Sequence, residues 1–369
     1  MTPLRIAVLP GDGIGPEVMS ACLELLEVVN DLAGGLGLIY ETVEAGAGCY
    51  RRTGQAIPEA SLRKATEADA ILLAAMGDPS VRYPDGTEIA PQIDLREKLQ
   101  LFAGVRPIRS LPGIPAVLAD PRASGIDFVI VRESTEGLFA ARGKSIVSGD
   151  ESVSDTMIIT RAVSERLFDF AFELAGRRKA RGFPGRVICV DKSNVLGSFA
   201  FFRRIFRERS ERHPGIEAEC AYVDAVGLNL VKRPWDYDVL VTENMFGDIL
   251  SDVGAAIIGG MGLAPSADLG EHHAVFQPCH GSAPDIAGRG LANPTAMFLS
   301  AAMMLEWIGE RHGRKQCLVA STMVTRAVEE AFRSGCLPCE MGGSDGTREV
   351  LDAVRSALFA TTESGLTAR

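Results

Sequence analysis

The sequence predicts an α/β protein with a substantial sheet, and three observations support this prediction. Apolar runs typical of buried strands alternate with amphipathic runs typical of helices along the chain. At 369 residues the chain exceeds one average domain, so we expect two domains within one compact body. The hydrophobic fraction of 46% and the charged fraction of 23% are those of an ordinary globular protein.

The expected elements follow one another from the N-terminus. RIAVLP predicts a strand that leads into a helix over about residues 16–32, and ADAILLAAMG predicts a second buried strand. Further strands are expected in IDFVIVRES, GRVICVDKS, YDVLVTEN and HAVFQPC, and helices in SERLFDFAFELAGRR and TAMFLSAAMMLEWIGERHG. The alternating start of DESVSDTMIITRAVSERL predicts a protruding β arm in the middle of the chain.

Charge and hydropathy exclude several kinds of partner. The formal net charge of −10 argues against a nucleic acid or an anionic membrane, because both attract a basic face. No run approaches about 18 uninterrupted apolar residues, and the first residues do not form a signal peptide, so we expect a cytoplasmic protein. The cysteines form no spaced framework, and reduced thiols are expected even for the C-x-x-C of Cys336 and Cys339.

The glycine-rich run LPGDGIGPEV lies between a predicted strand and a predicted helix. Its glycines at 11, 13 and 15 do not fit the G-x-G-x-x-G spacing of a Rossmann nucleotide site. Pro16 then stands where proline commonly opens a helix. The run therefore predicts a tight strand-to-helix turn.

The segment TENMFGDILSDVGAAIIGG carries two carboxylates four residues apart. A helix would place Asp248 and Asp252 on one face, where like charges are destabilising unless a cation lies between them. Carboxylate oxygens suit Mg²⁺ or Mn²⁺, and Asp224 in AYVDAVGLNL offers a third ligand. For the pair alone, a solvated acidic helix face remains the alternative.

Basic residues stand at the ends of several predicted elements. Lys192 follows the strand RVICV, and it is either an ion-pair partner or a base whose pKa is lowered by burial beside a metal. Arg96, Arg106 and Arg132 could converge on a di- or tricarboxylate through bidentate pairing. Taken singly, each is more often a surface arginine.

The loop QPCHGSAPDIAGRGLANPTAMF is dense in small residues, which let a backbone approach a ligand closely. Asp285 could accept both hydroxyls of an adenosine ribose, which favours NAD over NADP because a 2′-phosphate would be repelled. A plain connecting loop is the alternative. A metal site made by Glu271, His272, His273 and His280 is a weaker hypothesis, because their spacing fits no helical ligand pair.

Taken together, GDGIGPEV, VRESTEG, VDKSNVL, TENMFGDILSD and HGSAPDIAGRGLANPTA resemble the β-decarboxylating dehydrogenases. These enzymes act on isopropylmalate, isocitrate, homoisocitrate, tartrate or D-malate, and the motifs are closest to the NAD-dependent isopropylmalate dehydrogenase-like members. The resemblance runs nearly end to end in family order. It implies a two-domain, non-Rossmann fold of the isopropylmalate/isocitrate dehydrogenase type, with the active site in the interdomain cleft. Residues 1–106 and 260–369 would form the large, cofactor-side domain, and residues 107–259 the small domain.

The same resemblance implies a function. It implies NAD- and divalent-metal-dependent oxidative decarboxylation of a 2-hydroxy dicarboxylate, with 3-isopropylmalate or a close analogue as the expected substrate. Tartrate or D-malate, and isocitrate or homoisocitrate, remain alternatives, as does a non-catalytic, regulatory-type subunit. A homodimer with shared active sites is implied, in which Lys192 and Asp224 cross the subunit interface.

Carried over by position, the resemblance assigns proton-relaying, carboxylate-gripping, metal-binding and cofactor-binding roles. The catalytic residues would be Lys192 and Asp224. The substrate-binding residues would be Arg96, Arg106, Arg132 and Ile93. The ligands of Mg²⁺ or Mn²⁺ would be Asp224, Asp248 and Asp252. The residues on the NAD side would be Ile14, Glu88, His280, Gly281, Ser282, Ala283, Asp285, Ile286 and Asn293.

Two positions depart from the family pattern. Phe139 stands where most members have a tyrosine that protonates the enol, so we expect protonation to be impaired or taken over by water or by Lys144. Gln92, Ile93 and Asp94 stand where isopropylmalate enzymes have a leucine pair. One apolar side chain beside two polar ones does not clearly specify an isopropyl pocket.

Overall fold

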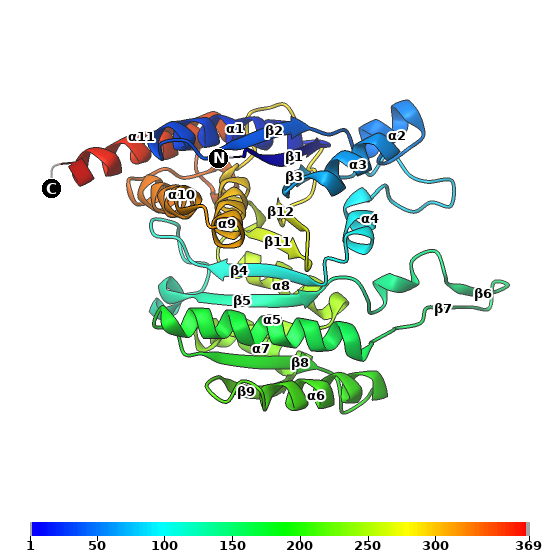
Figure 1. Cartoon of the computed structure of the whole chain (residues 1–369). Helices are drawn as coiled ribbons and strands as arrows, with labels where there is room; N and C mark the ends of the chain where they lie inside the picture. Colours follow the sequence, from blue (N-terminus) through cyan, green and yellow to red (C-terminus); the bar gives the residue numbers. More distant parts are fainter. Residues whose placement is uncertain (1, 367–369) are drawn as a thin grey trace.

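The computed structural model describes the backbone of residues 2–366 and the side chains of residues 2–360. Met1 and residues 367–369, which the predicted large domain includes, lie outside the described residues. Strands and helices alternate along the described chain, so the α/β prediction is confirmed (Figure 1). The strands are β1 (Leu4–Gly11), β2 (Leu38–Thr42), β3 (Ala70–Ala75), β4 (Ala103–Arg109), β5 (Asp127–Glu133), β6 (Ile146–Ser148), β7 (Ser152–Ser154), β8 (Arg186–Asp191), β9 (Glu217–Tyr222), β10 (Val239–Thr242), β11 (Pro265–Leu269) and β12 (Ala274–Pro278). The α-helices are α1 (Gly15–Leu32), α2 (Ala47–Thr53), α3 (Glu59–Glu67), α4 (Pro91–Lys98), α5 (Arg161–Ala180), α6 (Gly197–Ser210), α7 (Val223–Lys232), α8 (Asn244–Ile257), α9 (Thr295–His312), α10 (Lys315–Arg333) and α11 (Thr347–Leu366).

One sheet runs through the whole molecule. Across residues 2–366, its ten strands have the order β2-β1-β3-β12-β11-β4-β5-β10-β8-β9. The strands β2, β1, β3 and β12 are parallel to one another, as are β5, β10, β8 and β9. Between these groups, β11 and β4 pair antiparallel with each other and with their outer neighbours. The predicted domain boundary at residue 106 falls inside β4, so hydrogen-bonded strands continue across it.

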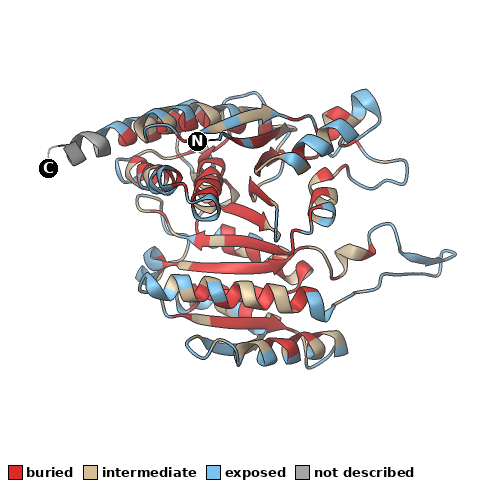
Figure 2. Ribbon diagram, in the orientation of Figure 1, coloured by how far each residue is buried: buried red, intermediate tan, exposed pale blue. Residues whose placement is uncertain are grey.

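The centre of the sheet has two chemically different faces. The strands are largely buried and helices pack over them (Figure 2). Because side chains alternate along a strand, Val105, Ala267 and Phe276 lie on one face, and the ring of Phe276 meets Trp307 of α9. Arg106 and its neighbours at every second position therefore lie on the opposite face, which carries the site described below.

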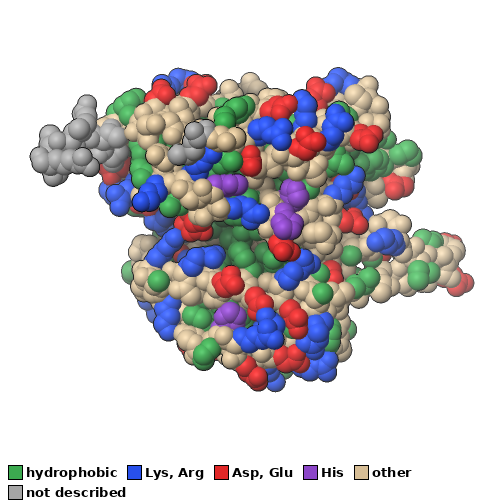
Figure 3. Space-filling view, in the orientation of Figure 1, with side chains coloured by type: hydrophobic (Ala, Val, Ile, Leu, Met, Phe, Trp, Pro, Cys, Tyr) green, Lys and Arg blue, Asp and Glu red, His purple; other side chains and the backbone are tan. Residues whose placement is uncertain are grey.

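The face that carries α5 and α9 is hollowed between the two halves of the molecule (Figure 3). A groove between these two helices is lined by the apolar side chains of Phe170, Leu174, Met303 and Trp307. Charged side chains of the same helices, such as Arg177 and Glu310, also line it. This groove is separate from the polar face of the sheet.

The predicted β arm is present. β6 and β7 form a second, two-stranded sheet that projects from the body (Figure 1). All residues of both strands are exposed, including Ile146, Val147 and Val153. The arm therefore presents apolar side chains outside the core of its own chain.

Neither a membrane span nor a disulfide is found in the described part of the chain. Among residues 2–366, no helix combines the length and the hydropathy needed to cross a membrane. The cysteines, among them Cys336 and Cys339, are free, in agreement with the expected reduced thiols.

Candidate active site

A cavity of about 250 Å³ lies on the polar face of the sheet. Its walls come from the ends of β3 and β12, from α4 and α8, and from the middle strands β4 and β5. Arg96, Arg106 and Arg132 line this arginine cavity together with Asp248 and Asp252. The fold thus brings together five side chains that come from four different elements.

Arg132 stands near the end of β5 and packs beneath α8. Its Nε and Nη2 donate to Oδ1 of Asn244 at 3.0 and 2.8 Å, and its Nη1 pairs with Asp248. A Cβ at Gly247 would lie 2.6 Å from Cγ of Arg132, so only glycine permits this close approach. Burial, followed by the charge of Arg96, lowers the pKa of Arg132 to about 10, and the guanidinium stays charged at neutral pH.

Asp248 and Asp252 lie one turn apart on α8, as the sequence predicted. Burial and then the charge of Asp248 raise the pKa of Asp252. A cation between the two carboxylates would relieve this repulsion, so the pair fits a divalent metal. Within residues 2–366 of one chain, however, no group of three or more His, Cys, Asp or Glu side chains forms a metal site.

Lys192 and Asp224 lie elsewhere in the chain and pair with each other. The parallel register of β8 and β9 sets Asp191 beside Tyr222. Lys192, directly after β8, and Asp224, two residues after the end of β9, therefore lie at the same end of the sheet. Nζ of Lys192 lies 2.7 Å from Oδ1 of Asp224, and their side chains are 29% and 66% exposed. The hydrogen bond from Lys192 lowers the pKa of Asp224. Neither residue lines the arginine cavity of its own chain.

The glycine-rich run after β1 forms the predicted tight turn. Helix α1 begins at Gly15 with proline in its first turn. Inside the turn, the carboxylate of Asp12 accepts hydrogen bonds from the backbone N–H groups of Ala47, Gly48 and Gly77, at 2.7, 2.8 and 2.8 Å. The turn is therefore fixed to the start of α2 and to the end of β3.

The predicted cofactor residues gather around this turn. The backbone N–H of Ile14 donates to the carbonyl of Ser282 at 2.8 Å, which joins the turn to the loop after β12. His280 and Gly281 of that loop also line the arginine cavity. Within the described residues, Nε2 of His280 is buried without a hydrogen-bond partner, and burial lowers the pKa of this ring. An unpaired buried ring nitrogen fits a site that a ligand completes.

The remaining residues of the cofactor prediction differ in their surroundings. Asp285 is exposed on the loop, and Ile286 packs against the main core. Ala283 has a φ of 36°, which is uncommon for a residue with a side chain. Oδ1 of Asn293 accepts a hydrogen bond from the backbone of Thr295 at 3.1 Å, at the start of α9. Glu88 is exposed on the segment that leads into α4.

Ile93 and Phe139 line the arginine cavity and also a neighbouring cavity of about 230 Å³. Lys144, one of the expected substitutes for the missing tyrosine, lines only the neighbouring cavity. Its Nζ donates to the carbonyl of Ala140 at 3.1 Å. Lys144 and the arginines therefore face two different cavities that share the Ile93 and Phe139 walls.

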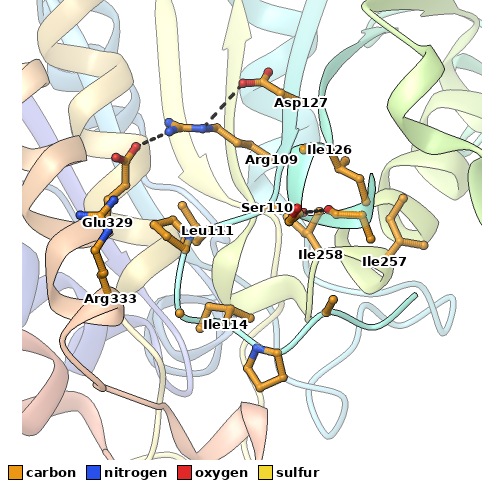
Figure 4. Close-up of a pocket in the computed structure, with 17 residues that line it drawn as sticks. Arg109, Ser110, Leu111, Ile114, Ile126, Asp127, Ile257, Ile258, Glu329 and Arg333 are labelled. Carbon is orange, nitrogen blue, oxygen red and sulfur yellow. Dashed lines mark hydrogen bonds and ion pairs between the residues drawn. The ribbon is translucent and has the colours of Figure 1, made fainter. Parts of the chain in front are cut away.

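A larger cavity of about 520 Å³ lies at the other ends of β4 and β5 (Figure 4). Its walls are mostly apolar, and Arg109 pairs there with both Glu329 and Asp127. Arg333 at its edge pairs with Glu330. Two arginines and one aspartate line the larger cavity, against three arginines and two aspartates in the arginine cavity, so the arginine cavity is the candidate active site.

Two residues of the site were not predicted from the sequence. Asn244 holds the guanidinium of Arg132, and Asp268 of β11 binds both Arg96 and Arg106. Each carried a local signal, because Asn244 lies two residues after the end of β10 and Asp268 is an acid inside the apolar run APSADLG. Their partners come from distant parts of the chain, and no local pattern indicates them.

Comparison with known proteins shows one family. The family model described as isocitrate/isopropylmalate dehydrogenase matches residues 5–354. A 3-isopropylmalate/3-methylmalate dehydrogenase from Methanocaldococcus jannaschii is 41% identical over 352 residues, which cover 95% of this chain and 97% of the relative. A homoisocitrate dehydrogenase from the same organism is 39% identical over 357 residues, covering 95% and 96%. Among solved structures, an isocitrate dehydrogenase from Methylococcus capsulatus has a TM-score of 0.84 at 34% identity, covering 97% and 99%.

Proposed function

This chain belongs to the isocitrate/isopropylmalate dehydrogenase family, and we propose that it catalyses the NAD- and divalent-metal-dependent oxidative decarboxylation of a 2-hydroxy dicarboxylate. Its relatives support a β-decarboxylating dehydrogenase, and 3-isopropylmalate or a close analogue is the first candidate substrate. The observation that carries the proposal is the convergence of three arginines and two aspartates on one cavity. Arginines of this kind bind carboxylates, and aspartates bind the metal that such chemistry needs.

The arginines would hold the carboxylates of the substrate. Arg96, Arg106 and Arg132 present planar N–H donors that match carboxylate oxygens in pairs. The contacts of Arg132 with Asn244 and Asp248 keep its guanidinium in place before the substrate arrives. Substrate held in this way would have a fixed orientation, which is a large part of catalysis.

Asp248 and Asp252 would hold the divalent cation, with Asp224 from a second copy of the chain as a further ligand. When bound, the cation would polarise the oxygen on C2, and NAD would accept the hydride. Lys192 would relay the proton of the C2 hydroxyl. Asp224, at 2.7 Å, orients the ammonium group of Lys192 for this role.

We also propose a homodimer with shared active sites. The exposed Lys192–Asp224 pair lies outside the cavity that holds the other residues of the proposed mechanism. Large apolar side chains are also exposed near this pair, on the segments that follow β8 and β9. They are Val195, Leu196, Leu228 and Val231. Exposed apolar groups that cluster in this way mark surfaces for association.

A mixing experiment tests the sharing. Lys192→Met and Arg96→Met should each inactivate the homodimer. Mixed dimers formed by co-expression should regain about a quarter of the wild-type rate, because half of the dimers are mixed and half of their sites are intact. Folded mixed dimers without activity would overturn the shared site and leave the assignment of the arginine cavity in place.

A substrate panel tests the function itself. The purified protein, with Mn²⁺ and NAD⁺, is given 3-isopropylmalate, tartrate, D-malate, isocitrate and homoisocitrate, and NADH and CO₂ are measured. We expect turnover that Lys192→Met abolishes and that Lys315→Met, a change of an exposed lysine on α10, leaves intact. If no acid of the panel reduces NAD⁺, the proposed function is wrong.

Tartrate or D-malate is the second candidate substrate. Gln92 lines the arginine cavity one helical turn before Arg96 on α4. Its amide suits a small or polar group next to the bound carboxylate better than an isopropyl group, which would leave the amide without a partner. Comparison of kcat/KM across the panel separates these two candidates.

A further inference from the structure

A single buried carboxylate stands behind the arginine cavity. Nη2 of Arg106 donates to Oδ1 of Asp268, and Nε of Arg96 donates to Oδ2, both at 2.9 Å. Nε2 of Gln277 also donates to Oδ2 at 2.9 Å, and the side chain of Asp268 is only 1% exposed. One carboxylate on β11 therefore fixes an arginine from α4 and another from β4.

The surrounding strands are built to hold this carboxylate. Asp268 lies directly opposite Gly104 in the antiparallel register of β11 and β4. A Cβ at Gly104 would lie 3.1 Å from Oδ1 of Asp268 and 2.6 Å from Oγ of Ser134, so glycine leaves the space that the ion pair needs. Nη1 of Arg106 is held as well, because it donates to the carbonyl of Ala267 at 3.0 Å.

Asp268 remains ionised in this buried position. Burial alone would raise its pKa, but the charges of Arg106 and Arg96 outweigh burial and hold the pKa well below its usual range. Its ion pair with Arg96 uses only Nε, so the two Nη groups of Arg96 are not engaged by Asp268. Fixed guanidinium groups lose less conformational freedom when a ligand binds.

Asp268 also sets the charge of the site. The three arginines of the cavity are matched by three carboxylates, those of Asp248, Asp252 and Asp268. A divalent cation on Asp248 and Asp252 would leave two positive charges, and the Lys192–Asp224 pair adds none. A dicarboxylate balances this sum, whereas a tricarboxylate brings one further negative charge into a buried site, where an unpaired charge is costly.

We propose that Asp268 is a positioning residue that holds Arg96 and Arg106 in place and makes the site selective for dicarboxylates over tricarboxylates. The proposal rests on the proposed function and narrows it. It separates 3-isopropylmalate, tartrate and malate, which carry two carboxylates, from isocitrate and homoisocitrate, which carry three. The names of the relatives include substrates of both kinds, so similarity alone does not make this distinction.

Binding measurements test the selectivity without turnover. The affinities of 3-isopropylmalate, tartrate, D-malate and isocitrate are measured by calorimetry on the full chain with Mn²⁺ and without NAD⁺. We expect the wild type to bind its best dicarboxylate at least about tenfold more tightly than isocitrate. Asp268→Asn should reduce this ratio about tenfold. Loss of the negative charge of Asp268 makes the site more positive by one unit, which attracts a trianion more strongly than a dianion.

Asp238→Asn is the matched control. Asp238 is another buried aspartate, and it pairs with Nε of Arg178 at 2.6 Å and accepts the backbone N–H of Gly185 at 2.8 Å, outside the arginine cavity. Its loss should lower stability and leave the binding ratio unchanged. Equal ratios in the Asp268→Asn and Asp238→Asn proteins would overturn the inference.

A double-mutant cycle tests positioning. If Asp268 acts through Arg96, Asp268→Asn should raise KM more than it lowers kcat. The factor by which Asp268→Asn lowers kcat/KM should be at least about tenfold smaller in an Arg96→Gln background than in the wild type. Additive effects would show a purely structural role and overturn the positioning claim.

If Asp268→Asn fails to fold, the ratio of dicarboxylate to isocitrate affinity in the wild type still tests the selectivity, because tight isocitrate binding contradicts the proposal. If no acid of the panel binds or is turned over, the proposed function is wrong, and the inference that rests on it is wrong as well.

Discussion

The guanidinium of Arg132 faces the ring of Phe139, with Cζ 5.4 Å from the ring centroid. The phenylalanine therefore lies beside a group that is proposed to hold the substrate. Its ring can attract the cation but has no proton to give. In the proposed reaction, the enol left after loss of CO₂ would then take its proton from water or from another side chain.

Phe139→Tyr should raise turnover on the true substrate by about tenfold or more, because a positioned general acid accelerates such steps. The measurement is kcat under saturating substrate and cofactor. Phe201→Tyr is the control, since that ring also faces an arginine, with Cζ of Arg204 5.1 Å from its centroid. Unchanged or reduced turnover in Phe139→Tyr would show that the acid lies elsewhere.

Asp285→Lys should shift cofactor preference from NAD toward NADP. The exposed carboxylate would repel a 2′-phosphate, and a lysine would attract it. The ratio of kcat/KM for the two cofactors should change by about a hundredfold, the product of losing one favourable contact and gaining another. Asp31→Lys, a change of an exposed aspartate near the end of α1, should leave the ratio unchanged. If the ratio of kcat/KM for the two cofactors is also unchanged in Asp285→Lys, the assignment of Asp285 to the adenosine ribose is wrong.

Asn244→Ala should reduce kcat/KM by about tenfold to a hundredfold, through a higher KM. The amide oxygen of Asn244 accepts both Nε and Nη2 of Arg132, and hydrogen bonds to charged groups contribute about 1.5–3 kcal/mol. Arg132 would then lose its fixed orientation. Asn229→Ala is the control, because that amide binds the exposed Arg233 away from the cavity. Equal KM values in Asn244→Ala and Asn229→Ala would show that Asn244 does not contribute to substrate binding.

Burial raises the pKa of Glu133 to about 7, from an ordinary value of 4.5. Between about pH 4.5 and 7 the folded protein keeps the proton of Glu133 while the unfolded chain releases it. The stability of the folded state with protonated Glu133 is therefore complete below about pH 4.5 and is lost as pH rises through about 7. Glu133→Gln removes the titration. Its free energy of unfolding relative to wild type should therefore increase from pH 5 to pH 8, by up to about 3 kcal/mol.

Urea unfolding at several pH values measures this difference. Glu133 accepts hydrogen bonds from the backbone N–H groups of Thr135 and Glu136, and the oxygen of a glutamine can keep one of them. Glu173→Gln, at an exposed position on α5, is the control and should show no trend. A difference between Glu133→Gln and wild type that does not change with pH would contradict the raised pKa.

Local patterns predicted those parts of the site that depend on neighbours in sequence. The spacing of Asp248 and Asp252 requires only a helix, and the apolar run before Arg132 requires only a strand, and both are present. The contact between Arg96 and Asp268 joins residues 172 positions apart, and it depends on the order and register of strands. Hydrophobic periodicity describes which side of a strand is buried and does not specify which strand lies beside it.

The β6–β7 arm has a consequence for how the stability of this protein must be stated. Two short strands alone are marginally stable in water, and the arm exposes the apolar side chains of Ile146, Val147 and Val153. If a second copy covers them, folding and association become one equilibrium governed by mass action. The melting temperature should then rise with protein concentration, and a free energy of unfolding has meaning only with the concentration at which it was measured.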